Sequence, residues 1–364
     1  MKNELEYLKN KRIMILAGGT GGHIFPAKTV AERLEQLGCK IFWLGTEKGL
    51  EKKLIESRFQ IDYIQMKGLR NKGLIRYMLM PITLLKSILA CVKIFRKHKI
   101  ELVLGFGGYV AAPGGLAAKL LVKPLIIHEQ NARSGLTNRV LSKFANAVLS
   151  AFEVPNLSKK LQVIGNPLRT DIIDLYKKDK QCNIERPCRI LVTGGSQGAQ
   201  VFNQLLPEVF KEVTKNHSIL VHHQSGLAEF EKTTAHYQKY QINAQVMPFI
   251  DRMNDAYQWA DMIICRAGAL TVSEVAACGL PAIFIPYPYA VDDHQYYNAQ
   301  MLVNADAAIC IRQSELSAEK LVSILTVWLK QKEVLSIKSY QAKAQAKIDA
   351  TEQVIKTVYQ VLSH

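Results

Sequence analysis

A short apolar segment followed by a glycine-rich loop and a helical pattern occurs twice in this chain, and this unit constrains the fold most. The first copy has apolar residues at 13–16, glycines within 18–22, and helical spacing of apolar residues from Pro26 to Leu37, closed by Gly38. A short apolar run bounded by glycine is typical of a buried strand, and glycine lets the backbone turn sharply beside a ligand. The pattern predicts strand, glycine loop and helix, a unit whose loop binds anionic or polar ligands in α/β sheets.

The second copy lies in the other half of the chain. An apolar run at 189–193 leads into the loop Gly194-Gly195-Ser196-Gln197-Gly198-Ala199. The polar segment 174–186 precedes it and is predicted to be a linker between domains. Further short apolar runs, each expected to be a strand, occupy 40–45, 101–104, 125–128, 163–164, 218–223, 244–250 and 262–265. The chain is therefore predicted to be an α/β protein with two similarly built halves, whose binding sites lie at the carboxyl ends of the strands.

Length and composition are consistent with two domains. The chain has 364 residues, 48% of them hydrophobic, which is enough for two sizeable cores. We expect a first domain at 1–172, a second at 173–340 and a final helical segment at 341–364 that packs back on the first domain. The seven cysteines are scattered without a Cys-x-x-Cys pair, which argues against disulfides and a zinc site. Residues 1–12 lack the apolar core of a signal peptide, so we expect a cytoplasmic location.

Positive charge is concentrated in the first half. Residues 1–180 contain 31 Lys and Arg against 14 Asp and Glu, whereas residues 181–364 contain 16 against 17. A basic half suits a solvated surface, nucleic acid or an anionic membrane, and the lack of a nucleic-acid-binding motif disfavours nucleic acid. An apolar cluster is flanked by Lys67, Arg70, Lys72 and Arg76 and consists of Leu74, Ile75, Met78 and Leu79. It is interpreted either as a buried helix with a basic face or as a shallow insertion into an anionic leaflet.

The glycine loops differ from those that bind common nucleotide cofactors. The loop at 18–22 is neither Gly-x-Gly-x-x-Gly nor a P-loop, and no acidic residue ends the second strand at Gly45. These differences argue against a nicotinamide cofactor and a P-loop nucleotide, and we expect no cofactor. The sequence contains no Asp-x-Asp, so we expect no metal on a diphosphate, and the adjacent Asp292 and Asp293 are interpreted as solvated surface.

The segment 266–274 predicts a ligand-binding turn in the second half. Gly268 permits a tight turn, and a helix that starts near Leu270 would present its N–H groups to a phosphate. Glu274, one turn inside, could accept hydrogen bonds from ribose hydroxyls or simply favour the helix dipole. The polar segment 292–299 suits contacts with sugar hydroxyls.

Six motifs in register resemble one family along nearly the whole chain. They are Gly18-Gly19-Thr20-Gly21-Gly22-His23, Gly105-Phe106-Gly107-Gly108-Tyr109, His128-Glu129-Gln130-Asn131-Ala132, Gly165-Asn166-Pro167, Gly194 to Ala199, and Arg266-Ala267-Gly268-Ala269-Leu270-Thr271. The chain resembles glycosyltransferase family 28, the bacterial enzymes that add N-acetylglucosamine to lipid I in peptidoglycan synthesis. This resemblance implies the GT-B fold, two Rossmann-like domains whose parallel sheets face each other across a cleft.

The resemblance also implies roles for individual residues and partners. UDP-N-acetylglucosamine would bind the second domain, with Arg169 approaching from the hinge side, through Ser196, Ile250, Ala269, Leu270, Thr271, Val272, Ser273, Glu274, Gln295 and Asn298. Lipid I would bind the first domain through Thr20, Gly21, Gly22, the loop 105–108 and Asn131. The apolar cluster at 74–79 would then rest on an anionic membrane, at the cytoplasmic face of the bacterial inner membrane. Other cell-wall synthesis proteins are further expected partners.

His23 is the first candidate for the catalytic base, because an imidazole is partly neutral near neutral pH. It would deprotonate the 4-hydroxyl of the acceptor's N-acetylmuramoyl unit, and one displacement would invert the anomeric centre, giving lipid II and UDP. The alternative for His23 is that it only positions the acceptor or a phosphate. Glu129 is the second candidate, and the alternative for Glu129 is that it orients its loop.

Three other functions remain open on the sequence alone. A UDP-N-acetylglucosamine 2-epimerase would share the architecture and the sugar nucleotide but would need acid and base groups at the sugar's C2. A glycolipid synthase would use diacylglycerol as the acceptor. A scaffold at the site of cell-wall assembly would release no UDP.

Overall fold

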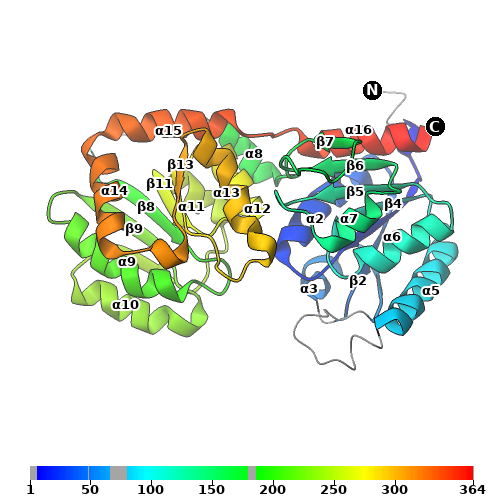
Figure 1. Ribbon diagram of the computed structural model, residues 1–364, viewed down its shortest axis with the longest axis horizontal. Helices are drawn as coiled ribbons and strands as arrows, with labels where there is room; N and C mark the ends of the chain where they lie inside the picture. The colour runs from blue at the N-terminus through cyan, green and yellow to red at the C-terminus, as the bar shows by residue number, and fades with distance from the viewer. Residues whose placement is uncertain (1–5, 48, 66–79, 179–185, 364) are drawn as a thin grey trace. The chain divides into compact units, whose positions relative to one another are not determined.

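The computed structural model describes residues 6–47, 49–65, 80–178 and 186–363. It divides into two compact units: unit 1 comprises Met1–Arg169 and Lys347–His364, and unit 2 comprises Thr170–Ala346. The domain limits predicted from the sequence fall after residues 172 and 340. Each unit is built around one parallel sheet, which confirms the predicted α/β class with two similarly built halves (Figure 1).

Seven parallel strands form the sheet of unit 1, in the order β3-β2-β1-β4-β5-β6-β7. They are β1 (Arg12–Ala17), β2 (Lys40–Gly45), β3 (Gln60–Tyr63), β4 (Leu102–Gly107), β5 (Leu125–Glu129), β6 (Ala147–Ser150) and β7 (Leu161–Val163). Ile15 of β1 pairs with Trp43 on one side and with Leu104 on the other. The strand order reverses between β1 and β4, so the loops after these two strands meet at a topological switch point, where α/β sheets bind ligands.

Helices cover both faces of this sheet, which explains why central strands such as β1 and β4 are buried and apolar along most of their length. They are α2 (Gly21–Gln36), α3 (Glu51–Ile55), α5 (Met80–His98), α6 (Ala111–Leu120), α7 (Leu136–Leu141) and α16 (Ala350–Ser363). Alternate residues of β1 enter two separate cores. Ile13 and Ile15 pack in one core with α2 and α16, whereas Met14 and Leu16 pack in the other with α5 and α6.

The first helix of the glycine-loop unit begins earlier than predicted. The sequence indicates a helix from Pro26, but α2 begins at Gly21 and Pro26 lies in its second turn. Thr20 is extended (φ −109°, ψ 156°), and its carbonyl accepts the N–H groups of His23 and Ile24, which starts the helix in spite of two glycines. His23 therefore lies on the first helical turn.

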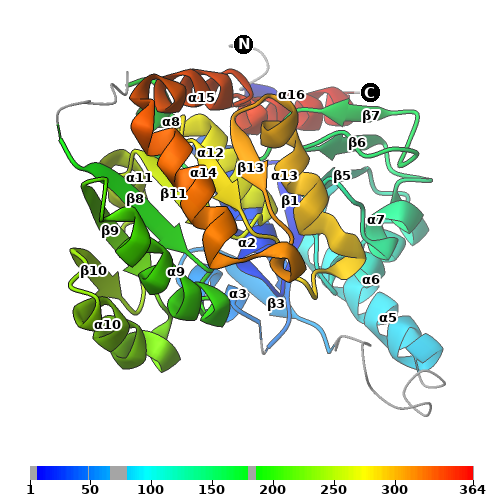
Figure 2. The ribbon, with the colours of Figure 1, turned by 60° about the vertical axis from the view of Figure 1, so that its left-hand side comes forward.

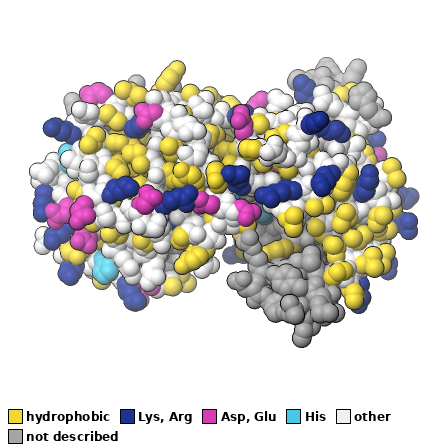
Figure 3. All heavy atoms as spheres, in the orientation of Figure 1, with side chains coloured by type: hydrophobic (Ala, Val, Ile, Leu, Met, Phe, Trp, Pro, Cys, Tyr) yellow, Lys and Arg dark blue, Asp and Glu magenta, His cyan; other side chains and the backbone are white. Residues whose placement is uncertain are grey.

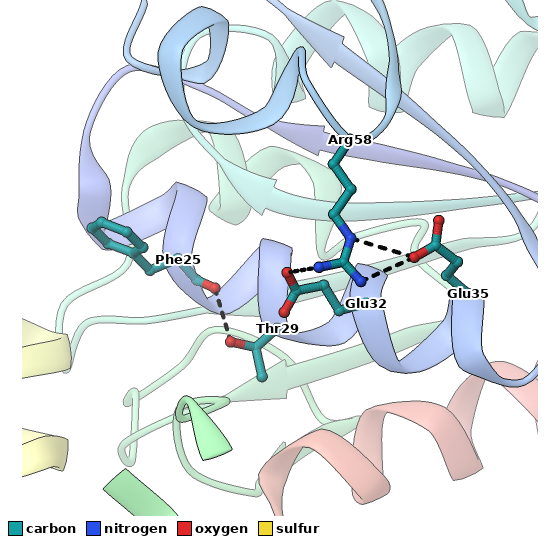
Figure 4. Close-up of polar contacts among 5 residues, drawn as sticks. All are labelled: Phe25, Thr29, Glu32, Glu35 and Arg58. Carbon is teal, nitrogen blue, oxygen red and sulfur yellow. Dashed lines mark hydrogen bonds and ion pairs between the residues drawn. The ribbon is translucent and has the colours of Figure 1, made fainter. Parts of the chain in front are cut away.

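The outer face of α2 is joined to the segment after α3 by Arg58. Its guanidinium lies 2.7 Å from Glu32 Oε1 and 3.1 Å from Glu35 Oε2 (Figure 4). On the same helix, Thr29 Oγ1 donates to the carbonyl of Phe25 at 3.1 Å. Exposed ion pairs contribute about 0–1 kcal/mol each, so the buried inner face of α2 supplies most of its stability.

Six parallel strands form the sheet of unit 2, in the order β10-β9-β8-β11-β12-β13. They are β8 (Cys188–Thr193), β9 (Ile219–Gln224), β10 (Ala244–Met247), β11 (Met262–Cys265), β12 (Ala282–Phe284) and β13 (Ala308–Cys310). The order reverses between β8 and β11. The loops after these strands, 194–199 and 266–268, therefore meet at the switch point of unit 2 as the corresponding loops do in unit 1.

Helices flank the second sheet as well. They are α8 (Thr170–Tyr176), α9 (Gln200–Val213), α10 (Phe230–Lys239), α11 (Met253–Trp259), α12 (Ala269–Ala277), α13 (His294–Asn304), α14 (Ala318–Lys330) and α15 (Lys332–Ala344). Helices α9 and α14 pack side by side and share one core, to which Phe202, Phe210 and Trp328 contribute (Figure 2). The predicted linker 174–186 is wrong in its first residues, because 174–176 belong to α8, which packs against α11 and α12.

Candidate functional site

Two loops interlock at the carboxyl edge of the unit 1 sheet. Gly107 ends β4 with φ +101°, and Gly108 follows with φ +80°, a region that favours glycine. A Cβ atom on Gly108 would lie 2.2 Å from the carbonyl oxygen of Gly18, and one on Gly107 would lie 3.0 Å from Nδ1 of His23. The glycines of the second loop thus allow it to pack directly on the first loop and on the histidine ring.

His23 is partly buried and is held by a chain of side chains from β5. Its Nδ1 lies 3.0 Å from Oε1 of Gln130, and Nε2 of Gln130 lies 3.1 Å from Nδ1 of His128. His128 is fully buried, and its Nε2 lies 2.9 Å from the carbonyl oxygen of Gly165. Burial lowers the pKa of His128 to about 4, so this imidazole is neutral at pH 7. The sequence analysis named His23 but missed the roles of Gln130 and His128.

Glu129 faces its own loop. Its Oε1 accepts the backbone N–H of Asn131 at 3.0 Å and its Oε2 accepts Nδ2 of Asn138 at 2.8 Å. The amide of Asn131 and the backbone N–H of Gly135 add longer contacts at 3.4 and 3.3 Å. This buried carboxylate therefore orders the segment 131–138, one of the two roles that the sequence left open for it.

Glu51 is a second buried carboxylate that the sequence analysis missed. It lies on α3 and accepts the backbone N–H of Thr46 at 2.6 Å, the Thr46 hydroxyl at 2.9 Å and the N–H of Gly19 at 3.2 Å. Glu51 is fully buried, although Lys52 and Lys53 beside it suggest a charged surface. The carboxylate thus already accepts the N–H of Gly19, so a ligand at the first glycine loop would contact the remaining residues Thr20, Gly21 and Gly22.

In unit 2, Gln224 joins two loops at the sheet edge. Its Nε2 donates to the carbonyl of Gly195 at 2.7 Å, and its Oε1 accepts the N–H of Ile250 at 2.8 Å. Ser196 is exposed in the first of these loops. Because the N–H of Ile250 is already bonded, its carbonyl oxygen is the backbone group that remains for a ligand.

Helix α12 starts at Ala269 after Gly268, as predicted to within one residue. Its first turns contain Leu270, Thr271, Val272 and Ser273. The N–H of Val272 already donates to the carbonyl of Gly268 at 2.9 Å, and the N–H groups before it are those that an α-helix directs out of its N-terminus. Glu274 is only 7% exposed. The hydroxyl of the buried Tyr257 donates to Oε2 of Glu274 at 2.9 Å and thereby orients this carboxylate.

The polar segment after β12 is ordered by its own side chains. Oε1 of Gln295 accepts the N–H of Tyr287 at 2.9 Å, which brings the start and the end of this segment together. Asn298 is fully buried, and its amide donates to the carbonyl of Ala267 at 3.2 Å, so it supports the turn before α12. Asp293 pairs with Arg312 at 2.7 Å. In the described ranges, no group of three or more His, Cys, Asp or Glu side chains could hold a metal ion.

The predicted membrane cluster, Leu74, Ile75, Met78 and Leu79, lies outside the described residues. The next helix, α5, exposes Ile82, Leu85 and Leu89, with 53%, 58% and 59% of each residue accessible. These residues share one side of the helix, because they are spaced by three and four positions. Figure 3 shows hydrophobic side chains gathered over α5 with Lys and Arg around them. No helix in the described part of the chain is long and apolar enough to span a membrane.

The predicted site residues thus form two groups, one in each unit. Thr20, Gly21, Gly22, His23, Glu129 and Asn131 come from the carboxyl edge of the unit 1 sheet. Ser196, Ile250, the segment 269–274, Gln295 and Asn298 come from loops and helices at the carboxyl edge of unit 2. Arg169, which is partly buried, is the last residue of unit 1 before the chain enters unit 2.

Comparison with known proteins matches both halves of the chain. Residues 13–150 match the glycosyltransferase family 28 N-terminal domain, and residues 189–354 match the family 28 C-terminal domain. The UDP-N-acetylglucosamine--N-acetylmuramyl-(pentapeptide) pyrophosphoryl-undecaprenol N-acetylglucosamine transferase of Francisella philomiragia is 45% identical, over 98% of this chain and 99% of the relative. The crystal structure of Acinetobacter baumannii MurG is 39% identical with a TM-score of 0.82, over 96% of this chain and 99% of that one.

A more distant likeness concerns the fold alone. The structure of a putative UDP-N-acetylglucosamine 2-epimerase from Listeria monocytogenes has a TM-score of 0.71 over 97% of each chain, but only 14% identity. The two parallel sheets, each with a glycine loop at its switch point, and the match of both halves define a GT-B glycosyltransferase. Within that class, the chain belongs to the MurG family of glycosyltransferase family 28.

Proposed function

We propose that this protein transfers N-acetylglucosamine from UDP-N-acetylglucosamine to the 4-hydroxyl of the N-acetylmuramoyl unit of lipid I, undecaprenyl-pyrophosphoryl-MurNAc-pentapeptide, giving lipid II and UDP. The observation that carries this proposal is the 45% identity, over nearly the full length of both chains, with a relative named for that transfer. The 2-epimerase alternative is not favoured, because the epimerase structure matches at a level that reflects the fold alone.

The sugar nucleotide is proposed to bind unit 2. The first turn of α12 and the loop with Ser196 would hold its diphosphate, because N–H groups and the positive end of a helix dipole attract anions. Glu274, oriented by Tyr257, would accept the ribose hydroxyls, and the carbonyl of Ile250 would accept the N–H of uracil. Gln295 and Arg169 would contact the sugar and the phosphates. Asn298 would act indirectly by holding the turn at Ala267.

Lipid I is proposed to bind unit 1 at its switch point. Thr20, Gly21 and Gly22 would contact the acceptor pyrophosphate, and Asn131, held by Glu129, would contact the acceptor sugar. His23 would take the proton from the 4-hydroxyl as its oxygen forms a bond to C1 of N-acetylglucosamine. The bond from C1 to the phosphate oxygen breaks with its electron pair leaving on UDP. A single displacement of this kind inverts the anomeric centre, and the donors of unit 2 stabilise the departing diphosphate.

The undecaprenyl tail of the acceptor calls for a membrane surface near unit 1. We propose that the exposed apolar side of α5, together with the cluster at 74–79, rests on an anionic leaflet at the cytoplasmic face of the inner membrane. Basic residues within and beyond this apolar stripe, such as Lys86 and Lys93, are exposed, and each positive charge near such a surface adds about 1 kcal/mol. Other cell-wall synthesis proteins would meet the enzyme there.

UDP release with defined substrates tests the proposal. We expect UDP and a glycosylated lipid when both UDP-N-acetylglucosamine and lipid I are present, and neither product when lipid I is replaced by diacylglycerol. Incubation with the sugar nucleotide alone should give no 2-epimer. Formation of the epimer, or no UDP with the authentic acceptor, would contradict the proposal.

The variant His23→Ala tests the role of the base in the same assay. Loss of a general base lowers turnover by about 10²–10⁴-fold, whereas binding of UDP-N-acetylglucosamine, measured by calorimetry, should persist because His23 is not among the residues proposed to bind the donor. Near-normal turnover would remove His23 from the catalytic role.

A further inference from the structure

We propose that Gln130 and His128 act as positioning residues that fix the tautomer of His23, with the proton on Nδ1 and the lone pair on Nε2. The catalytic meaning of this arrangement rests on the proposed function, but the tautomer itself follows from the hydrogen bonds within unit 1. The contacts run from His23 through Gln130 and His128 to Gly165, and two backbone carbonyls, those of His128 and Gly165, determine the donor and the acceptor in each of them.

The carbonyl of His128 decides which way the amide of Gln130 points. One end of that amide lies 3.0 Å from the His128 carbonyl oxygen and 3.1 Å from the His128 Nδ1. A carbonyl oxygen only accepts hydrogen bonds, so the amide end beside it must be the NH₂ group. Oε1 of Gln130 consequently points at His23. Gln130 is 1% exposed, and its own carbonyl accepts Nδ2 of Asn166 at 3.3 Å, which holds the backbone at this point.

The carbonyl of Gly165 decides the tautomer of His128 independently. His128 Nε2 lies 2.9 Å from that oxygen and must therefore carry a proton. Since this fully buried ring is neutral, its Nδ1 has a lone pair and accepts one of the Gln130 N–H groups. The orientation of Gln130 deduced from the first carbonyl and the tautomer of His128 deduced from the second agree with each other.

The same logic reaches His23. Oε1 of Gln130 can only accept, so Nδ1 of His23, 3.0 Å away, is its donor and carries the ring proton. In the neutral ring the lone pair is then on Nε2, and no described residue hydrogen-bonds that atom. Nε2 is thereby the atom of His23 that can remove a proton from a hydroxyl.

An amide at this position differs from a carboxylate in one useful respect. A carboxylate partner would also stabilise the charged imidazolium strongly and would favour a histidine that is already protonated. The neutral oxygen of Gln130 selects the tautomer with much less of that effect. An amide does not titrate, so Gln130 cannot take the Nδ1 proton when His23 gains a second proton at Nε2. The proton taken up at Nε2 is therefore also released from Nε2. The contacts orient the base but do not relay its proton.

Nitrogen NMR of the protein labelled in its histidine rings tests the tautomer without any substrate. Two-bond proton–nitrogen correlations show which ring nitrogen carries the proton, recorded well above neutral pH, and the His23→Gln variant assigns the His23 signals. We expect the native protein to show His23 protonated on Nδ1. A native His23 protonated on Nε2 overturns the proposal, whatever the activity of the enzyme, and thereby separates its failure from failure of the proposed function.

The variant Gln130→Met removes the polar partner at similar volume. We expect the His23 proton to distribute over both ring nitrogens and kcat to fall about 10²-fold, as for impaired general-base catalysis, with both KM values nearly unchanged. Gln224→Met, which alters an equally buried amide in unit 2, should leave the His23 signals as they are in the native protein. A Gln130→Met protein with native His23 signals would contradict the proposed coupling.

Discussion

Two buried carboxylates hold loops of unit 1 in place, one carboxylate for each loop. Glu51 fixes the first glycine loop and Glu129 fixes the segment after β5, each by accepting hydrogen bonds from backbone N–H groups and side chains. A buried carboxylate is stable only when such donors surround it. These two residues therefore stabilise the native conformation of the loops.

Replacing Glu51 by Gln should destabilise the protein by about 2–3 kcal/mol, because an amide offers one acceptor oxygen where three hydrogen bonds to a charged group now form. Denaturant unfolding followed by circular dichroism measures this loss. Glu47→Gln is the matched control, since Glu47 is exposed on the loop between β2 and α3. This variant should change the free energy of unfolding by no more than about 0.5 kcal/mol. Equal effects of the two variants would contradict the role given to Glu51.

The buried His128 predicts a loss of stability in acid. Its pKa in the folded protein, about 4, lies below that of an unfolded histidine, about 6.5. As the pH falls below about 6.5 the unfolded chain binds the proton first, so stability decreases until the pH reaches about 4. This residue alone accounts for up to about 3 kcal/mol over that range.

Unfolding midpoints of native protein and His128→Gln, measured between pH 7 and pH 4, check this effect. We expect a shallower acid slope in the variant. His236→Gln, a change at an exposed histidine, should retain the native slope. Parallel slopes for all three proteins would refute the assignment.

The residues around His23 in the sequence were enough to predict it as a candidate base, but they could not predict which residues position it. His23 follows its glycine loop directly, so the motif predicts that it lies near the carboxyl edge of the sheet. Gln130 lies more than a hundred residues further along the chain, and it meets His23 only because β1, β4 and β5 are neighbours in the sheet. Gly165 is more distant still and acts on His23 only through His128 and Gln130. Glu51 was missed for a related reason, since its two lysine neighbours resemble a solvated surface.

At the scale of elements, the loop after β4 is shaped by where a side chain cannot fit. Gly108 combines a positive φ with a carbonyl oxygen at 2.2 Å from the position of a Cβ, whereas Gly19 has a positive φ of 91° but no atom within 4 Å. The two positions therefore separate backbone strain from steric exclusion within one unit.

Gly108→Ala should destabilise the protein well beyond Gly19→Ala. In Gly19→Ala the only cost is an alanine in the left-handed region, about 1–2 kcal/mol. In Gly108→Ala the loop must in addition move away from the carbonyl of Gly18. We expect at least twice the loss of unfolding free energy for Gly108→Ala in denaturant titrations. A similar loss in both variants would show that the two loops separate without cost.

The bounds of the helices and strands show which parts of the fold could be predicted from the sequence. Strands such as β1, β4 and β8 were predictable because each contains a short apolar run that is buried on both faces. The shorter strands β3, β6, β12 and β13 were not predicted. The start of α2 was not, because glycine and an internal proline are poor helix residues, and the helix forms there through the Thr20 carbonyl. Helix α8 was likewise hidden in a polar segment, since its stability comes from packing against α11 and α12.

At the scale of the whole molecule, charge and apolar surface coincide in the first half of the chain. The excess of Lys and Arg lies within residues 1–180, and the exposed apolar side of α5 belongs to the same half. Such a combination suits adsorption to an anionic leaflet, with the chemistry confined to the water phase.

Leu85→Glu on α5 should weaken binding to vesicles that contain phosphatidylglycerol, because it replaces an inserted apolar group by a repelled charge. Sedimentation with vesicles measures the bound fraction. Leu227→Glu, at a residue of unit 2 that is 83% exposed, serves as the control and should leave the binding as in the native protein. Unchanged sedimentation of Leu85→Glu would remove α5 from the proposed membrane contact.

The last helix, α16, has a consequence for how the chain matures on the ribosome. Val354 and Val358 belong to the same core as Val30 and Leu34, although the whole of unit 2 is synthesised between them. Unit 2 is contiguous and can fold as soon as it emerges, whereas unit 1 must wait for α16 before the core that α16 shares with α2 is complete. A nascent chain that stalls or is cleaved before α16 would therefore leave unit 1 more vulnerable to proteases than unit 2.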